Sequence, residues 1–295
     1  MKSNVRKLLV TTFGRYPQQM VDPLQIEAVT KNTISVALNQ ARKSRVANRR
    51  VKRFENSLAR KATVMTRKNI HKQIDFFRIA DSLLKEVKSK NLPFRANGYP
   101  DLTRFKFLRA LPADIEVWPY SKRHQALRKS RTVIVFFEPD TQLYGYLNKL
   151  DVVSEELSEY YAVCGFDLSP CGSDDLRLQR MMILLNQLVN AHLLMSGVNV
   201  IPTLRTGDVP TFDALVSYPR DIAFALGSLG CARGNVAHNI RNLTTKVFMT
   251  EPSELLSYGF LRTEYKAVLD TLQVPFREEP DYRSIRFGRA NRKAA

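Results

Sequence analysis

Short apolar runs recur at regular intervals in the second half of the chain, and they alternate with longer segments in which apolar residues have helical spacing. The runs lie at 132–137, 161–166, 198–204, 222–226 and 255–258. Near-continuous apolar strands between helices are typical of parallel β-α-β units, because helices cover both faces of a parallel sheet. The pattern therefore predicts an α/β body over residues 93–274, built of parallel strand-helix units as an open or barrel-like sheet.

The longest helix of this body is expected over residues 174–195, between the second and third runs. Apolar residues recur along it with helical spacing, which predicts a helix that is largely buried. Leu185 and Leu188 are expected on its buried face.

The first third of the chain has a different pattern. Residues 26–92 contain neither glycine nor proline and are rich in Ala, Arg, Lys, Leu and Asn, which predicts helix. Apolar residues such as Val51, Phe54 and Leu58 form one narrow stripe, so the rest of each helical surface is cationic. We expect a basic helical N-terminal extension over residues 1–92.

The distribution of charged residues also distinguishes the first third of the chain from the α/β body. Residues 41–90 carry 16 Lys and Arg against 4 Asp and Glu, whereas residues 136–275 carry 10 against 16, in a chain of net charge +18. An ordinary exposed helix pairs its basic residues with acids at i, i+4, and such acids are scarce here. This imbalance favours contact with the phosphates of DNA or RNA over a merely solvated helix. The candidate contact residues are Arg42, Lys43, Arg45, Arg49, Arg50, Lys52, Arg53, Arg60, Lys61, Arg67 and Lys68.

Two further segments lack the regular pattern of the body. In residues 93–130, prolines and glycines mark turns, and the aromatic side chains are expected to seal the edge of a core rather than to stack on bases. Residues 275–295 carry six Lys and Arg with three acids. This composition predicts a basic C-terminal tail that is disordered in the free protein and able to fold on a polyanion.

No stretch of the sequence approaches the roughly 18 to 20 consecutive apolar residues that a membrane helix needs. The apolar run at residues 8–13 is too short for the core of a signal peptide. Three cysteines without an export signal argue for reduced thiols and against a disulfide framework. We expect a soluble, cytoplasmic protein that does not bind a membrane.

Polar side chains follow the apolar runs. In a parallel α/β fold these positions meet at one edge of the sheet, where ligands bind. We therefore expect Glu138, Asp167, Arg205 and the glycine-rich turn at 227–234 to lie around one cleft. The candidate catalytic residues are Glu138, Asp167, Asp208 and Tyr258. The candidate cofactor-binding residues are Arg205, Gly227, Ser228, Gly230 and Arg233.

The polar residues of that cleft have two possible roles, in binding or catalysis or in stabilising the fold, and the sequence does not decide between them. Glu138, Asp167 and Asp208 could hold Mg²⁺ for phosphodiester chemistry, since hard cations prefer carboxylate oxygens. Helix capping explains carboxylates at strand ends without a metal, so no metal ligand is assigned and Mg²⁺ is the one candidate cofactor. The backbone amides of the turn at 227–234, with Arg233, could cradle a phosphate, but a tight strand-to-helix turn also requires glycine.

Zinc and nucleophilic catalysis are disfavoured. Cys164 and Cys171 have six residues between them, as do Cys231 and His238, and structural zinc sites use closer pairs. The chain has no G-x-S-x-G motif, and His192 lies among leucines on the long helix, where a packed histidine is expected.

Five short motifs are spread over the body in strand order. They are Phe-Phe-Glu-Pro-Asp at 136–140, Phe-Asp-Leu-Ser at 166–169, Val-Ile-Pro-Thr-Leu-Arg-Thr-Gly-Asp at 200–208, Gly-Ser-Leu-Gly-Cys at 227–231 and Ser-Tyr-Gly at 257–259. Over roughly residues 115–260 the chain resembles the domain of unknown function 4417 family, which occurs in bacteria, their phages and mobile elements. The chain departs from the family pattern at Thr206, at Leu229 and within 186–195. The resemblance implies no reaction.

We therefore expect a nucleic-acid-associated protein of a phage or mobile element that binds DNA or RNA mainly through phosphate contacts. Two alternatives from other classes stay open. One is an enzyme that uses the strand-end cleft for metal-assisted phosphoryl or nucleotide chemistry. The other is a structural or assembly protein whose basic helices bind an acidic partner.

Overall fold

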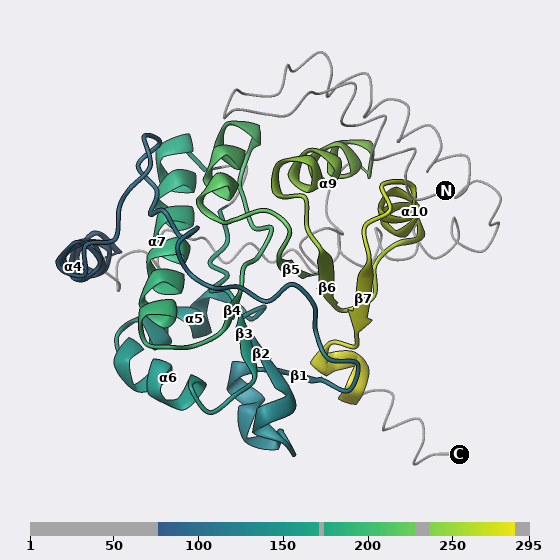
Figure 1. Cartoon of the computed structure of the whole chain (residues 1–295), viewed down its shortest axis with the longest axis horizontal. Coiled ribbons are helices and arrows are strands. Elements are labelled where there is room, and N and C mark those ends of the chain that lie inside the picture. Colours follow the sequence, from purple (N-terminus) through teal and green to yellow (C-terminus); the bar gives the residue numbers. More distant parts are fainter. Residues whose placement is uncertain (1–75, 171–173, 228–235, 287–295) are drawn as a thin grey trace.

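The computed structural model describes residues 76–170, 174–227 and 236–286, in which strands and helices alternate (Figure 1). The α-helices of these ranges are α4 (Phe76–Ser89), α5 (Asp140–Leu147), α6 (Leu150–Leu157), α7 (Leu176–Met195), α9 (Val236–Thr250) and α10 (Thr263–Thr271). The strands are β1 (Glu116–Pro119), β2 (Thr132–Val135), β3 (Ala162–Cys164), β4 (Val200–Ile201), β5 (Ala223–Gly227), β6 (Glu254–Tyr258) and β7 (Phe276–Glu279). Three 3₁₀ helices are η2 (Tyr120–Gln125), η3 (Lys129–Arg131) and η4 (Val209–Ser217). The α/β class predicted from the sequence is confirmed.

All strand pairs are parallel, and the strands lie side by side in chain order. One sheet holds β1 to β4 and the other holds β5 to β7. A parallel bridge between Thr203 and Ala225 joins their edges, and Ala225 both donates to Pro202 O at 2.8 Å and accepts from Leu204 N at 2.9 Å. The carboxyl ends of successive strands therefore point to one edge of the combined sheet.

The sheet curls along its length. The ring of Trp118, on β1, lies 6.4 Å from the ring of Tyr282, which follows β7. A flat sheet of seven strands would hold its outer strands about 29 Å apart, at roughly 4.8 Å per strand. The architecture is therefore barrel-like, one of the two forms that the sequence predicts.

Successive side chains along each strand point to opposite faces of the sheet, so the strands contribute to two separate hydrophobic cores. One set of side chains packs on the concave side of the sheet, where small residues such as Ala162, Ala223 and Ala225 keep the interior narrow. The opposite set, which includes Ile134, Phe166 and Phe224, packs beneath the helices. Both faces of strands β2 to β6 are largely buried, which explains why their sequences are nearly continuous apolar runs.

Helix α7 forms the largest buried face of any helix in the described ranges. Its N-terminus is capped by Asp175, whose carboxylate accepts from Arg177 N at 2.7 Å. Leu185 and Leu188 are fully buried, so the buried face predicted from the sequence is confirmed.

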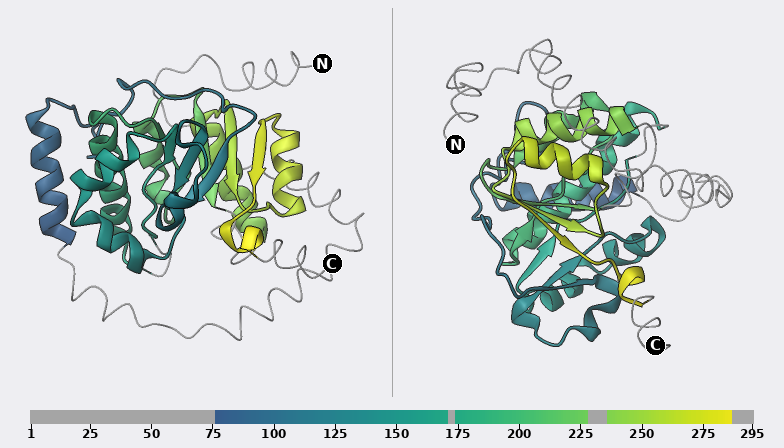
Figure 2. Two further views of the ribbon diagram at one scale, coloured as in Figure 1. Left: turned by 90° about the horizontal axis from the view of Figure 1, so that it is seen from below. Right: turned by 90° about the vertical axis from the view of Figure 1, so that its right-hand side faces the viewer.

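Helix α4 packs against α7 at one end of the molecule, opposite α10 (Figure 2). It buries Ala80, Leu83 and Val87, and Glu86 accepts from the ring of His192 on α7 at 2.8 Å. The end of the segment predicted as an extension therefore docks on the body through an apolar stripe and one polar contact. The candidate phosphate-contact residues from Arg42 to Lys68 lie outside the described residues.

The prediction of a free C-terminal tail from residue 275 is wrong for the described part of that segment. Strand β7 pairs with β6, and a short helical turn follows it over 282–286. Arg277 anchors the strand through its guanidinium, which donates to the carbonyl oxygens of Leu111 and Pro112. Backbone pairing with β6 and side-chain bonds such as this one hold β7, whose four residues are all only partly buried.

None of the helices in the described ranges combines the length and apolarity needed to cross a membrane.

Candidate ligand-binding cavity

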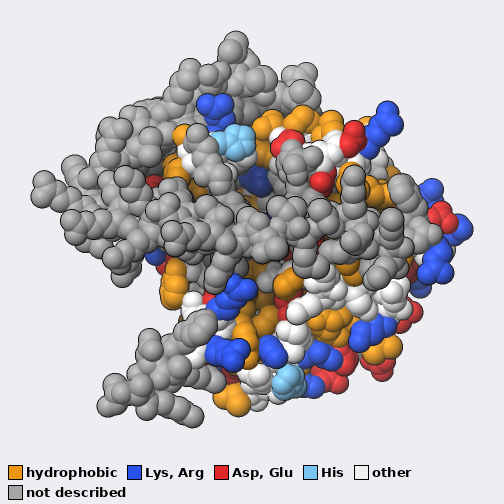
Figure 3. Space-filling model, turned by 180° about the vertical axis from the view of Figure 1, so that it is seen from behind, with side chains coloured by type: hydrophobic (Ala, Val, Ile, Leu, Met, Phe, Trp, Pro, Cys, Tyr) orange, Lys and Arg blue, Asp and Glu red, His pale blue; other side chains and the backbone are white. Residues whose placement is uncertain are grey.

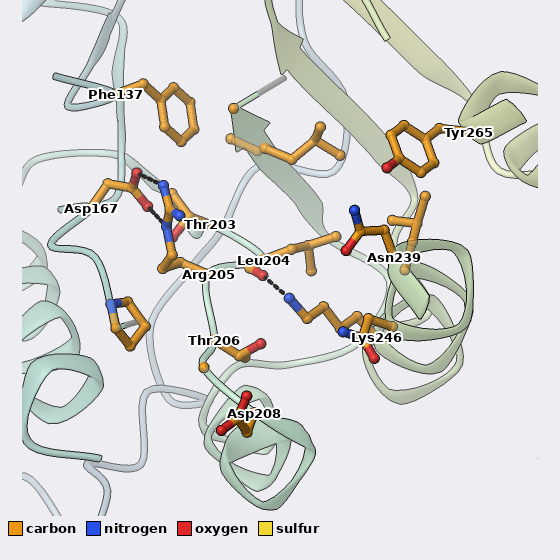
Figure 4. Close-up of a pocket in the computed structure, with 17 residues that line it drawn as sticks. Phe137, Asp167, Thr203, Leu204, Arg205, Thr206, Asp208, Asn239, Lys246 and Tyr265 are labelled. Atoms are coloured by element: carbon orange, nitrogen blue, oxygen red, sulfur yellow. Dashed lines mark hydrogen bonds and ion pairs between the residues drawn. The ribbon is translucent and has the colours of Figure 1, made fainter. Parts of the chain in front are cut away.

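A cavity of about 280 Å³ opens at the carboxyl edge of the sheet (Figure 4). Its walls come from the ends of β2 to β5, from the loop that leads into η4, and from one face of α9. The polar and charged residues of the wall are Asp167, Thr203, Arg205, Thr206, Asp208, Asn239, Asn242, Lys246 and Tyr265, the last from α10. Its apolar side chains include Phe137, Leu204, Leu226 and Leu243. This is the position at which parallel α/β folds bind ligands.

Asp167 and Arg205 form a bidentate pair in the wall of this cavity (Figure 4). Arg205 Nε donates to Asp167 Oδ1 at 2.7 Å, and Nη2 donates to Oδ2. The Asp167 side chain is only 3% exposed and that of Arg205 is 25% exposed. Burial raises the pKa of the Asp167 carboxyl, whereas the guanidinium of Arg205 opposes the rise. Arg205 is therefore the member of the pair that a ligand can reach, and Asp167 fixes it from behind.

Two buried asparagines on α7 hold the backbone around Asp167. Asn186 accepts from Leu168 N and donates to Leu168 O, each at 2.9 Å. Asn190 accepts from Phe166 N at 2.9 Å. These bonds satisfy backbone groups that have no partner on a neighbouring strand. They also fix the backbone on both sides of Asp167 and so the direction of its side chain.

Gln179 fixes the opposite rim of the cavity. Its Oε1 accepts from Asp208 N at 2.7 Å and its Nε2 donates to Asp208 Oδ2 at 2.9 Å. A Cβ on Gly207 would lie 2.1 Å from Gln179 Oε1, so a larger residue there would displace the Gln179 side chain from this position. The loop that carries Thr206 and Asp208 is thus held in one place by α7.

Helix α9 supplies the remaining polar wall. Lys246 Nζ donates to Leu204 O at 2.9 Å and lies 5.1 Å from the centroid of the Phe212 ring. Asn239, Asn242 and Lys246 fall at i, i+3 and i+7, which puts all three on one face of the helix. The lysine and the two asparagines of the cavity wall therefore come from one helical stripe.

Two polar atoms of the wall lack a hydrogen-bond partner within the described ranges. They are the hydroxyl oxygen of Thr206 and Oδ1 of Asn242. Thr206 is only 8% exposed, so water reaches it poorly. Buried polar atoms in folded proteins are normally paired, so these two atoms are open to a water, an ion or a ligand in the cavity.

The residues predicted to share one cleft are brought together only in part. Asp167, Arg205, Asp208 and Gly227 line the cavity. Ser228, Gly230 and Arg233 lie outside the described residues, as do the other positions of 228–235.

The prediction that Glu138 lines the shared cleft is wrong. The chain turns directly after β2, where Glu138 N donates to Phe136 O at 2.7 Å, and the side chain points to the loop after β1. Its carboxylate accepts from Ser121 N at 3.3 Å, and burial raises its pKa. Glu138 therefore belongs to a neighbouring polar cluster and not to the cavity wall.

Tyr258 also lies outside the cavity wall. It belongs to the concave core of the sheet, its ring stacks on Phe137 at 5.9 Å, and its hydroxyl accepts from Tyr282 N at 2.9 Å. Burial raises its pKa above the ordinary value. These contacts give Tyr258 a packing role that accounts for its position.

The described residues do not assemble a cation site. No group of three or more His, Cys, Asp or Glu side chains within these ranges is placed to hold a metal ion. Both oxygens of Asp167 bond to Arg205, and Glu138 faces another loop, so the carboxylate set proposed for Mg²⁺ is not brought together. Cys164 is buried in β3, where burial raises the pKa of its thiol; Cys171 and Cys231 lie outside the described residues.

Sequence reasoning missed the contribution of α9. Asp167, Arg205 and Asp208 follow apolar runs, which predicts their place at the edge of the sheet, whereas the polar residues of α9 lie within a helix. The spacing of Asn239, Asn242 and Lys246 was the signal that would have found them.

Together these features define a parallel α/β protein with a ligand-sized, mixed polar and apolar cavity at the carboxyl edge of its sheet. The chain belongs to the family described as domain of unknown function (DUF4417), whose family model matches residues 94–274. No curated protein and no solved structure matches the chain. Helix α4 and strand β7 lie outside the matched range.

Proposed function

We propose that the protein associates with nucleic acid and contacts the phosphates of DNA or RNA through its basic N-terminal extension. The main support for this proposal is that the excess of basic residues is concentrated in one segment of the chain. Residues 1–75 hold 17 Lys and Arg against 4 Asp and Glu, whereas residues 76–295 hold 29 against 24. A charge excess confined to one segment is what a polyanion-binding extension on a nearly balanced body would show.

The described body supports this division, because much of its basic surface is balanced locally. Arg131 lies 3.2 Å from Asp114, Lys266 lies 2.6 Å from Glu278, and Lys129 bonds to Glu159. Basic and acidic side chains lie next to one another on the described part of the face in Figure 3. Such pairs contribute little to stability, but they cancel the field that would attract a polyanion.

Binding of this kind has a quantitative signature. Each phosphate that a Lys or Arg neutralises on duplex DNA releases about 0.9 counterion, so affinity falls steeply with salt. Contacts to phosphates carry no base information, so the affinity should depend little on nucleotide sequence.

The test is a titration of fluorescent DNA and RNA oligonucleotides with the full chain across a series of salt concentrations. We expect steep salt dependence for the wild type. An extension variant with five glutamine substitutions should lower the slope of log K against log salt by up to about 4.5. Its substituted residues are Arg42, Lys43, Arg45, Arg49 and Arg50.

A body variant provides the control, because it loses the same number of charges at exposed positions. Its residues changed to glutamine are Lys106, Lys149, Arg177, Arg220 and Arg241. The body variant should keep most of the wild-type slope. Equal losses in the two variants, or wild-type affinity that does not change with salt, would contradict the proposal.

The cavity favours a second activity, the binding of a small molecule at the carboxyl edge. The described residues supply cationic and amide groups there, but they supply no cluster of cation ligands. The cavity therefore supports ligand recognition more directly than it supports the metal-assisted chemistry that the carboxylates suggested.

A further inference from the structure

The cavity wall places cationic groups beside unpaired neutral polar atoms. Arg205 reaches the cavity with Asp167 behind it, and Lys246 lies on the facing helix. Lys246 brings a positive charge to this wall, and one of the three N–H donors of its ammonium group bonds to Leu204 O. These two residues form the part of the cavity that suits an anionic group (Figure 4).

The unpaired atoms add a second requirement. Asn242 Oδ1 is an amide oxygen and can only accept, and the Nδ2 of the same side chain already bonds to the ring of His238 at 3.0 Å. The hydroxyl of Thr206 can donate or accept, and its side chain is more than nine-tenths buried. A ligand that satisfies both atoms must carry hydroxyl or amino hydrogens as well as an anionic group.

The size and the apolar part of the wall restrict the ligand further. The cavity volume of about 280 Å³ lies just below the roughly 300 to 1,000 Å³ range of typical small-molecule sites. Phe137, Leu226 and Leu243 give it apolar surface next to the polar groups. Inorganic phosphate would leave this apolar surface and Asn242 Oδ1 without contacts.

We propose that the cavity binds a nucleoside monophosphate. In this arrangement Arg205 and Lys246 contact the phosphate, Asn242 and Thr206 contact sugar hydroxyl or base amino groups, and the apolar wall covers the remaining surface. None of the residues to which this proposal assigns a contact belongs to the basic extension, so the proposal does not depend on the nucleic-acid association proposed above.

The test is calorimetric titration of the full chain, at fixed salt, with adenosine, guanosine, cytidine and uridine monophosphates. We expect at least one of them to bind and the corresponding nucleoside to bind at least about tenfold more weakly. Lys246→Met should weaken binding of the monophosphate by about tenfold or more. Thr206→Val keeps the shape of the side chain while it removes the hydroxyl, and we expect a loss of roughly three- to tenfold.

Controls separate this site from the extension. Lys149→Met removes an exposed lysine that is not in the cavity wall and should bind like the wild type, as should the five-glutamine extension variant. Lys246→Met should keep wild-type affinity for oligonucleotides. No heat with any monophosphate, or equal affinity in Lys246→Met, Thr206→Val and the wild type, would overturn the proposal. Inorganic phosphate that binds as tightly as the nucleotide would overturn the assignment of a nucleoside.

Discussion

Replacing Leu188 with alanine is expected to lower the free energy of unfolding by about 2 to 5 kcal/mol. The Leu188 side chain is fully buried in the main core, where α7 meets the sheet and the helices around it. Its truncation removes apolar contacts and leaves a cavity that close-packed neighbours fill only in part. Urea unfolding of the full chain, followed by circular dichroism, measures the change.

Leu176→Ala is the matched control, because it makes the same substitution in the same helix at a side chain that is 40% exposed. We expect it to change the free energy of unfolding by less than about 1 kcal/mol, as is usual for surface substitutions. Leu188→Ala with a loss no greater than that of Leu176→Ala would show that the buried face of α7 is misplaced.

Arg205→Met is expected to destabilise the protein by about 3 kcal/mol near pH 8, in the range found when one partner of a buried ion pair is removed. The variant leaves the carboxylate of Asp167 buried, at 3% exposure, without its guanidinium. Burial already raises the pKa of Asp167, and the loss of Arg205 removes the main opposing interaction.

The loss of stability in Arg205→Met should depend on pH, and the raised pKa of Asp167 determines the direction of this dependence. An acid whose pKa is higher in the folded than in the unfolded state binds more protons when the protein is folded. The free energy of unfolding therefore falls as pH rises from about 4, the ordinary pKa of Asp, through the pKa of Asp167 in the folded state. The deficit of Arg205→Met relative to the wild type should therefore shrink as pH is lowered from 8 towards 4. Urea unfolding at several pH values measures it.

Arg220→Met breaks the exposed pair with Glu251 and serves as the control. We expect it to cost less than about 1 kcal/mol with little pH dependence. Adding Asp167→Leu to Arg205→Met should recover part of the lost stability, since an apolar side chain needs no counter-charge. A deficit in Arg205→Met that stays constant from pH 8 to pH 4 would contradict the assignment of the buried carboxylate.

The strands that could be predicted from the sequence are those buried on both faces. Each of the five predicted apolar runs overlaps one of the strands β2 to β6. Strand β1 has the sequence Glu-Val-Trp-Pro in a region rich in prolines, and β7 has the sequence Phe-Arg-Glu-Glu. Both are outer strands of their sheets and are held by pairing with one neighbour and by distant contacts, which local patterns do not encode.

The part of the candidate site that lies at the ends of strands could be predicted from the sequence. Asp167 and Arg205 follow neighbouring strands, so the topology alone brings them to one edge. Their pairing with each other was not predictable, because it depends on the asparagines of α7 that aim Asp167. Glu138 failed as a cavity residue because one backbone turn after β2 redirects its side chain.

The nucleic acid that stays with the full chain during purification at low salt tests the central claim most directly. We predict that the wild-type protein elutes with material that absorbs at 260 nm and that nuclease removes. The five-glutamine extension variant should elute with much less of this material, and the matched body variant should retain it. Wild-type protein free of nuclease-sensitive material, or equal amounts with all three proteins, would contradict nucleic-acid association through the extension.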